Sequence, residues 1–349
     1  MPRLLTASYR ESAVSAAGQI HRLIRDGEME EVIELVNDNA SLLIQPNSIG
    51  WTSLHFSASH EISVEHWKYL LERIPEKTQL LSLKTDMGLT FIDHFFLRYL
   101  NPLPWQRPEV HEAAETLRER ISSALKSKEA IGHIRRSIDS KTPHDMHDDP
   151  LLEFWDRIQS MLKSVWGPRP FRLLHALATT GCPEEVAELA LKLFPEQQSH
   201  RDEQSLLPLH YACLHPSSKY PLETLLSNHV DEPDADGSLP LHLALTSSRT
   251  WRTGISSLWS AYPLYDSKCH TKTNFPPFLL ATMPDPVQSR RKVQQRAAQN
   301  FQGMWRFLST ASQLRAMADA RRQIELEHLD TIYELLRAEP SAIVCSSFE

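Results

Sequence analysis

The stretch Leu207-Pro208-Leu209-His210-Tyr211-Ala212 recurs later in the chain as Leu239-Pro240-Leu241-His242-Leu243-Ala244. The two histidines are 32 residues apart. Between the two copies lie an apolar run, Pro221 to Leu226, and a loop rich in Asp, Pro and Gly, Asp231 to Gly237. A fixed period in the low thirties is typical of a solenoid whose repeats each contain a turn and two helices. The sequence therefore predicts an all-α fold.

The proline of each copy predicts where a helix begins. Proline is tolerated in the first turn of a helix, because the backbone N–H that it lacks would have no helical partner there. We therefore expect helices to begin at Pro208 and Pro240. The leucine after each proline should face the neighbouring repeat, and the small alanine that ends each copy should let adjacent helices approach closely.

The motif Leu-Pro-Leu-His-x-Ala resembles the Thr-Pro-Leu-His-x-Ala motif of the ankyrin-repeat family, in a divergent form with Leu for Thr. The resemblance implies an ankyrin-like solenoid of helix-turn-helix units with short hairpin fingers. It also implies that His210 and His242 bond the loop backbone and pin the turn to the helix; a catalytic or metal-binding role is the alternative. Leu207 and Leu239 replace the threonine whose hydroxyl usually partners this histidine. A tetratricopeptide array is the alternative fold, and the Leu-Pro-Leu-His pair argues against it.

Weaker copies of the unit precede and follow the two strong ones. Gly50 to His55 keeps the Thr and the His, and Gly88 to Asp93 has Asp in the His position. His21 and His175 each have Gly six residues later and Val eleven residues later. Leu279 continues the series after His242. The resemblance thus extends to roughly six or seven units, some of them degenerate.

The period breaks between Asp93 and His175, which are 82 residues apart. The polar stretch 109–138 predicts one or two solvated helices, and Asp149 and Pro150 predict the start of an amphipathic helix. We therefore divide the chain into four segments. They are N-terminal ankyrin-like repeats (1–96), a helical insertion and linker (97–150), the main ankyrin-like repeats (151–286) and a C-terminal helical capping region (287–349).

Composition limits the classes of function. The net charge of −7 argues mildly against nucleic-acid binding, and only ten glycines leave little material for a glycine-built nucleotide site. Four scattered cysteines without a Cys-x-x-Cys pair suit a reducing compartment. No apolar run is long enough for a membrane span. We expect a monomer without a cofactor, located in the cytoplasm or alternatively in the nucleus.

Extended repeat stacks bind other proteins along the surface formed by their first helices and finger tips. The sequence therefore predicts a non-enzymatic scaffold with a protein partner. By their position in the fingers and first helices, the expected partner-binding residues are Trp51, Met87, Gln204, Leu206, Tyr211, Ala235, Ser238 and Leu243. Ile49 and Leu89 occupy similar positions.

Two alternative functions depend on other parts of the chain. The stretch His144 to Asp149 collects His and Asp side chains that could bind a divalent metal or serve a hydrolytic site. The stretch 289–322 interleaves basic and aromatic residues, including Arg290, Arg291 and Lys292, and could bind an anionic partner. A polar linker and the solvated face of a helix explain the same residues without any ligand.

Overall fold

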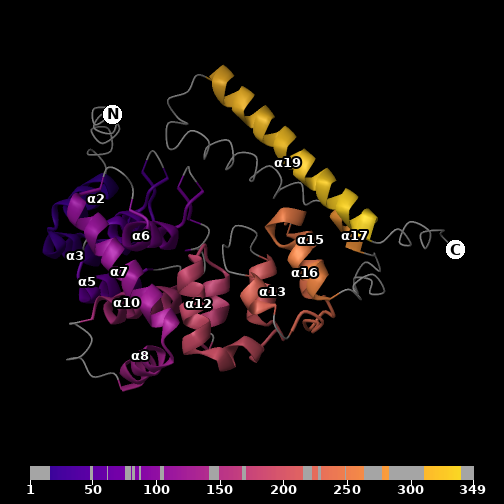
Figure 1. Ribbon diagram of the computed structural model, residues 1–349. Helices are drawn as coiled ribbons and strands as arrows, with labels where there is room; N and C mark the ends of the chain where they lie inside the picture. Colours follow the sequence, from indigo (N-terminus) through magenta and orange to yellow (C-terminus); the bar gives the residue numbers. More distant parts are fainter. Residues whose placement is uncertain are drawn as a thin grey trace. The chain divides into compact units, whose positions relative to one another are not determined.

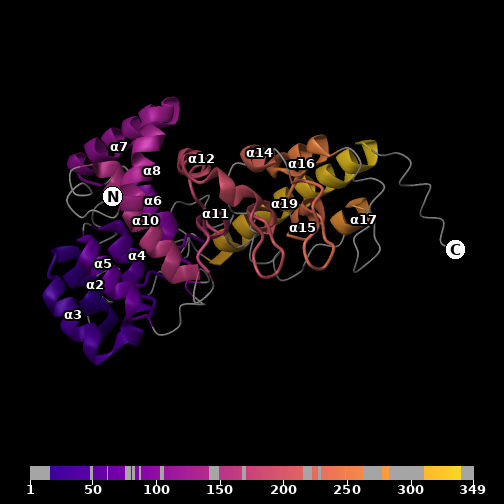
Figure 2. The same cartoon turned by 90° about the horizontal axis from the view of Figure 1, so that it is seen from below.

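The computed structural model describes residues 16–47, 50–60, 62–74, 80, 83–85, 88–102, 106–140, 149–166, 170–214, 222–226, 229–247, 249–262, 277–282 and 310–338. Within these ranges the fold is all-α, and no strand is present (Figures 1 and 2). The chain forms two compact units, Met1–Ala176 and Leu177–Glu349. The all-α fold expected from the sequence is confirmed, and the division into four segments stays a prediction.

Unit 1 begins with two layers of short helices. The first layer consists of α2 (Ala16–Asp26), α4 (Ser53–Ser59) and α6 (Phe91–Leu100), and α4 packs against both of the others. The second layer consists of α3 (Met29–Asp38) and α5 (Val64–Glu72), with the 3-10 turn η1 (Ala40–Leu43) after α3. In α5 the apolar side chains Trp67, Leu70 and Leu71 are buried.

Three longer helices complete unit 1. They are α7 (Pro108–Lys126), α8 (Lys128–Ser140) and α10 (Pro150–Trp166), and α10 packs against α5, α7 and α8. Asp149 caps α10 as predicted, because its Oδ1 accepts a hydrogen bond from the N–H of Leu151 at 3.0 Å. The polar stretch 109–138 does form two helices, α7 and α8.

Unit 2 continues with alternating short helices. The helix α11 (Leu173–Ala178) spans the unit boundary and is followed by α12 (Glu184–Leu193) and η3 (Pro195–Ser199). Next come α13 (Pro208–Leu214), α14 (Leu222–Leu225), α15 (Pro240–Thr246), η4 (Trp251–Thr253) and α16 (Ile255–Ala261). Both proline-initiated helices therefore begin where the sequence predicts.

The last part of unit 2 consists of α17 (Pro277–Ala281) and the 29-residue helix α19 (Thr310–Ala338). The first helices α13, α15 and α17 pack in succession, and α19 packs against α17 and η4 (Figure 1). The Thr331 hydroxyl accepts a hydrogen bond from the N–H of Trp251 at 2.7 Å, which fixes α19 against η4.

In each unit an arginine from a later segment binds a carbonyl at the end of a first helix. In unit 1, Arg98 of α6 donates to the Ser59 carbonyl at 3.1 Å. In unit 2, Arg249 donates to the Ala212 carbonyl at 2.5 Å and is buried. The last carbonyls of a helix have no partner within that helix. These arginines therefore supply partners for helix-end carbonyls and tie a later segment to the preceding helix.

Candidate protein-interaction surface

The same tight turn precedes a first helix twice in unit 1. The N–H of Asn47 donates to the Trp51 carbonyl at 2.8 Å, and the N–H of Gly50 donates to the Asn47 carbonyl at 3.1 Å. In the second turn, the N–H of Thr85 donates to the Leu89 carbonyl at 2.9 Å, and the N–H of Gly88 donates to the Thr85 carbonyl at 2.8 Å. The two turns, which precede α4 and α6, therefore have the same backbone hydrogen bonds.

Unit 2 contains two further copies of this turn. The N–H of Asp202 donates to the Leu206 carbonyl at 2.9 Å, and the N–H of Asp234 donates to the Ser238 carbonyl at 3.0 Å. The two aspartates also cap their own turns, because Oδ1 of Asp202 accepts from the N–H of Leu206 at 2.8 Å and Oδ1 of Asp234 accepts from the N–H of Ser238 at 2.7 Å. A hydrogen bond of 3.3 Å from the N–H of Ala235 to the Gln204 carbonyl joins the two turns.

The fourth residue of each turn has a left-handed backbone. Glycine occupies this position three times, at Gly50, Gly88 and Gly237, each with φ of 75°. Ser205 occupies it once, with φ of 58°. A side chain makes this conformation costly, so three of the four turns use the residue that adopts it most easily.

The histidine of the motif closes the turn onto the helix in both units. In unit 2 the N–H of Leu207 donates to Nδ1 of His210 at 2.9 Å. In unit 1 the N–H of Thr52 donates to Nδ1 of His55 at 3.1 Å, and the Thr52 hydroxyl lies 2.8 Å from the same nitrogen. The backbone bond therefore survives the replacement of Thr by Leu. Where Asp93 replaces the histidine, its Oδ2 accepts from the N–H of Thr90 at 2.7 Å.

The second ring nitrogen binds the following turn. Nε2 of His55 lies 3.3 Å from the Leu89 carbonyl, and Nε2 of His210 lies 3.0 Å from the Glu232 carbonyl. Because Nδ1 accepts a hydrogen bond from a backbone N–H, the ring proton is on Nε2, and this N–H donates a hydrogen bond to the carbonyl. Burial lowers the pKa of both histidines to about 4, so the rings stay neutral at pH 7. The loop bonds that the sequence motif implies for His210 are present.

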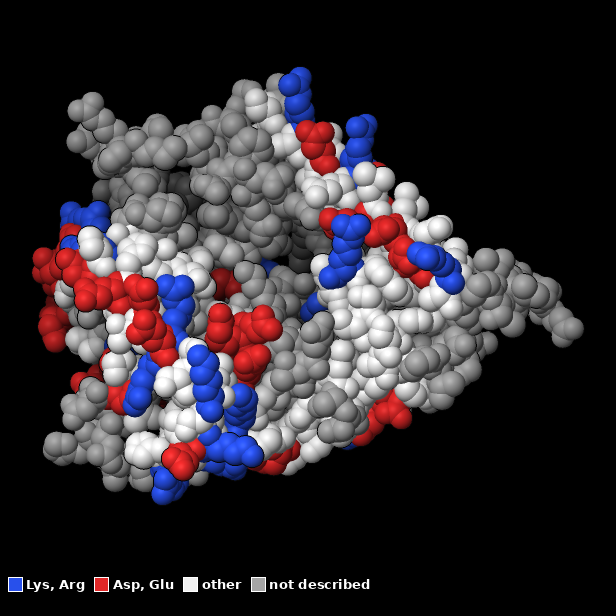
Figure 3. Space-filling view, viewed as in Figure 1, with Lys and Arg blue, Asp and Glu red and all other residues white. Residues whose placement is uncertain are grey.

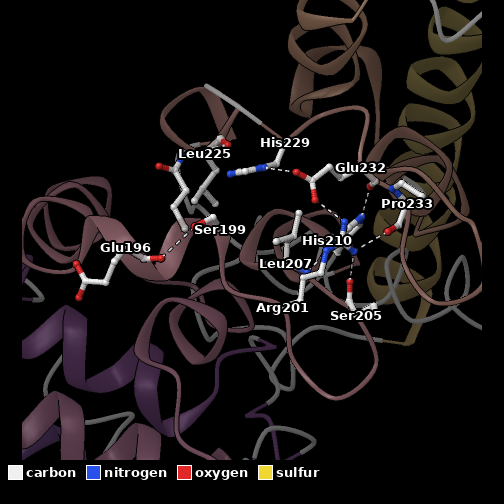
Figure 4. Close-up of polar contacts among 11 residues, drawn as sticks. Glu196, Ser199, Arg201, Ser205, Leu207, His210, Leu225, His229, Glu232 and Pro233 are labelled. Atoms are coloured by element: carbon white, nitrogen blue, oxygen red, sulfur yellow. Dashed lines mark hydrogen bonds and ion pairs between the residues drawn. The ribbon is translucent and has the colours of Figure 1, made fainter.

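Arg201 organises the turns of unit 2 (Figure 4). Its Nη1 donates to the carbonyls of Ser205 and Pro233, both at 2.8 Å, and its Nη2 forms an ion pair with Glu232. His229 also bonds Glu232, at 2.6 Å, and these two partners hold the pKa of that carboxyl below its ordinary value. No local pattern in the sequence indicates this network, because Arg201 and Glu232 lie 31 residues apart.

The residues expected to bind a partner differ in exposure. The exposed ones are Gln204 and Ala235, and the half-buried ones are Trp51 and Leu243. Leu206, Tyr211 and Ser238 are buried, which leaves little of each side chain for a partner. Met87 and Ile49 lie outside the described residues, and Leu89 is half-buried. Their role in binding stays a prediction.

Two of the expected residues have internal partners. The Tyr211 hydroxyl donates to Oδ2 of Asp202 at 2.7 Å, which ties the first helix α13 back to its turn. The Trp51 ring lies 4.3 Å from the His94 ring and 5.1 Å from the Phe56 ring, measured between centroids. Trp51 therefore contributes to the packing of unit 1 while part of its surface stays open to solvent.

The alternative sites fall mostly outside the described residues. His144 to Asp148 lie outside them, and Asp149 caps α10 and pairs with Arg120 at 2.9 Å. In the ranges that the structure describes, no three His, Cys, Asp or Glu side chains are placed to hold a metal ion. Of the basic stretch 289–322, only residues 310–322 are described. Among the helices described, none is long and apolar enough to cross a membrane.

No protein-family model matches the chain, and a search of curated proteins finds no match either.

Proposed function

We propose that this chain is a divergent ankyrin-like repeat protein and that it acts as a non-enzymatic scaffold. The observation that carries the proposal is the repeated turn, which has the same backbone bonds at Asn47, Thr85, Asp202 and Asp234. The histidine bonds at His55 and His210 support it further, because they join each turn both to its own helix and to the next turn.

The partner surface consists of the exposed turn tips and the adjoining first helices. Gln204 and Ala235 sit at the tips of two hydrogen-bonded turns and expose their side chains. A rigid backbone beneath exposed side chains suits binding, because little conformational entropy is lost when a partner docks. Half-buried Trp51 supplies an aromatic side chain of the kind enriched at binding hot spots.

The chemistry of the described residues supports a role in binding. His55 and His210 are neutral and both ring nitrogens of each bind the backbone, so these two side chains serve the turns. Burial raises the pKa of the Cys182 and Cys213 thiols, Cys213 to about 12, which makes both poor nucleophiles at pH 7. These unpaired thiols also support a cytoplasmic or nuclear location.

The test compares proteins captured from a native lysate by matched variants. Gln204→Arg with Ala235→Arg places two cations on the turn tips, whereas Glu184→Arg with Glu185→Arg changes two exposed residues of the second helix α12. We expect the first pair to lose a small set of proteins that the wild type and the second pair retain. Identical captures by all three would contradict the turn-tip surface.

A further inference from the structure

The helix α19 exposes apolar side chains on the side that faces away from its own unit. Leu326, Leu329 and Tyr333 are 59%, 60% and 62% exposed. Thr331 and Leu335, which are buried, each lie two residues from a member of this set and therefore on nearly the opposite side of the helix. Large apolar side chains in such a row are typical of an interaction site.

The spacing of the exposed residues matches a helix-pairing surface. Leu326, Leu329, Tyr333 and half-buried Leu336 follow one another at intervals of three, four and three residues. This is the a and d pattern of a heptad repeat, which packs against a second helix with the same spacing. We call these four residues the α19 stripe.

The charges beside the stripe select the second helix. Around Leu326 and Leu329, Glu325 occupies g and Asp330 occupies e, so acidic residues flank this half of the α19 stripe on both sides. Around Tyr333 and Leu336, the same two positions hold Ile332 and Arg337. Charged residues of both signs occur along α19 with uncharged residues between them (Figure 3). Arg321 pairs with Glu325 at 2.8 Å and Arg252 lies 3.6 Å from Asp330, but both arginines are exposed and such pairs are weak.

A second copy of this chain fits the α19 stripe poorly. In a parallel pair, g faces e of the other helix, so Glu325 would meet Asp330 of the second copy. In an antiparallel pair, e faces e, so two copies of Asp330 would meet. Like charges in these positions oppose pairing. A helix whose Lys or Arg side chains face Glu325 and Asp330 would instead find opposite charge on both sides of Leu326 and Leu329.

We propose that the α19 stripe binds an amphipathic helix of another protein, with apolar residues at a and d and basic residues at e and g. This surface lies on α19, apart from the turn tips of the proposed scaffold function, and binds a partner of its own. The helix is bound through its apolar row, and its flanking charges set the specificity.

The experiment uses the full chain and two synthetic three-heptad peptides with Leu at a and d. One peptide carries Lys at e and g, and the other carries Glu. We expect fluorescence anisotropy to show binding of the Lys peptide and much weaker binding of the Glu peptide. Leu329→Asp should weaken binding of the Lys peptide by about tenfold or more. Equal binding of the two peptides, or unchanged binding by Leu329→Asp, would overturn the proposal.

Two further variants separate the stripe from general effects. Leu314→Asp alters a leucine of the same helix that is 63% exposed but outside the heptad positions, and it should leave binding unchanged. Glu325→Lys with Asp330→Lys should transfer the preference to the Glu peptide. Since all these side chains are at the surface, the variants should melt like the wild type.

The remaining measurements identify other occupants. A dimer in sedimentation that Leu329→Asp dissociates would make a second copy the occupant and overturn the charge argument. Gln204→Arg with Ala235→Arg should bind the Lys peptide as the wild type does. If the turn-tip variants retained every captured protein, the scaffold proposal would fail and the α19 proposal would be unaffected. If the peptides did not bind as expected, the α19 proposal would fail and the scaffold proposal would be unaffected.

Discussion

The two units of this chain use one turn and one histidine bond, yet they surround the histidine differently. In unit 1, His21, His55 and His94 are buried in consecutive first helices, and the rings of His55 and His94 are 5.5 Å apart. In unit 2, the turn beside His210 is bound by Arg201 and Glu232. Unit 1 thus gathers neutral rings in its core, whereas unit 2 fixes its turns with charged side chains near the surface.

Buried histidine nitrogens without a hydrogen-bond partner add to this difference between the units. Both ring nitrogens of His21 and the Nε2 of His94 are buried without a hydrogen-bond partner. A ring in this situation cannot take up a proton without leaving a buried charge. The same turn and first helix can therefore be stabilised in two ways. In unit 1 they pack on buried neutral histidines whose protonation would be costly, and in unit 2 charged side chains bind the backbone of the turns.

The largest expected effect is a loss of stability in unit 1 at acid pH. Burial lowers the pKa of His21 and His55 to about 4 and that of His94 to about 3, against 6.5 in the unfolded chain. The unfolded state therefore binds more protons below pH 6.5, and stability falls from there down to the folded pKa values. The loss should reach several kcal/mol, at about 1.4 kcal/mol per pKa unit.

Hydrogen exchange followed peptide by peptide between pH 7 and pH 4 would test this difference. Unit 1 should lose protection ahead of unit 2, in which His210 has a pKa of about 4 and two backbone bonds. His94→Phe should reduce the acid effect in unit 1, since Phe56 occupies the same place in the preceding first helix. If both units lost protection at the same pH, the expected difference in acid stability between them would be wrong.

The second prediction concerns one glycine in each unit. Replacing it by alanine should lower the free energy of unfolding in unit 2 and raise it in unit 1. A Cβ at Gly254 in unit 2 would lie 2.2 Å from Cδ1 of Leu222, and φ there is 125°. Gly254→Ala should therefore cost about 3 kcal/mol through steric overlap and backbone strain. A Cβ at Gly132 in α8 of unit 1 meets nothing within 4 Å, so Gly132→Ala should stabilise by about 0.5–1 kcal/mol. Urea unfolding of both variants measures the two signs, and a stabilising Gly254→Ala would be the contrary result.

The third effect concerns the arginines that bind the ends of the first helices. Arg249→Met leaves the Ala212 and Thr253 carbonyls without their donor, in a buried site, and should cost about 2 kcal/mol. Arg98→Met in unit 1 removes one bond, to the Ser59 carbonyl, from a half-buried side chain, and should cost about 1 kcal/mol. Thermal unfolding of the two variants gives the ranking, and a larger cost for Arg98→Met would reverse it.

The smallest effect concerns the one turn that lacks glycine. Ser205→Gly relieves a left-handed serine in unit 2 and should stabilise by about 0.5–1 kcal/mol after the entropy of the unfolded chain is counted. Gly88→Ser makes the reverse change in unit 1 and should destabilise by a similar amount. Denaturant midpoints of the two variants would check whether the turns are equivalent, and shifts of the same sign would show that they are not.

Local features of the structure could be read from the sequence because local residues cause them. Pro208 and Pro240 begin helices, and Asp202 and Asp234 cap turns through their own backbone neighbours. The bond from the N–H of Leu207 to His210 spans three residues and depends only on the helix start. Such features need no knowledge of the rest of the fold.

Exposure was less predictable than local geometry. Tyr211 and Ser238 were expected on the partner surface by their position in the motif, yet both are buried. The Tyr211 hydroxyl donates a hydrogen bond to Oδ2 of Asp202 in the preceding turn, which holds the side chain against the protein. The position of a residue in the motif places its backbone in the turn or in the first helix. The side chains around it determine how much of its own side chain is exposed to solvent.

The all-α class, the helix starts and the turns follow from the amino-acid sequence, because helix propensity, capping and the hydrophobic period act over a few residues. Three features depend on long-range packing instead: Arg201 binds Glu232, Arg249 binds a carbonyl near the end of α13, and one face of α19 is exposed. These contacts join residues separated by 31 positions or more, or depend on which surfaces the fold covers. No local pattern encodes them, since the same amphipathic row can face a core or a partner.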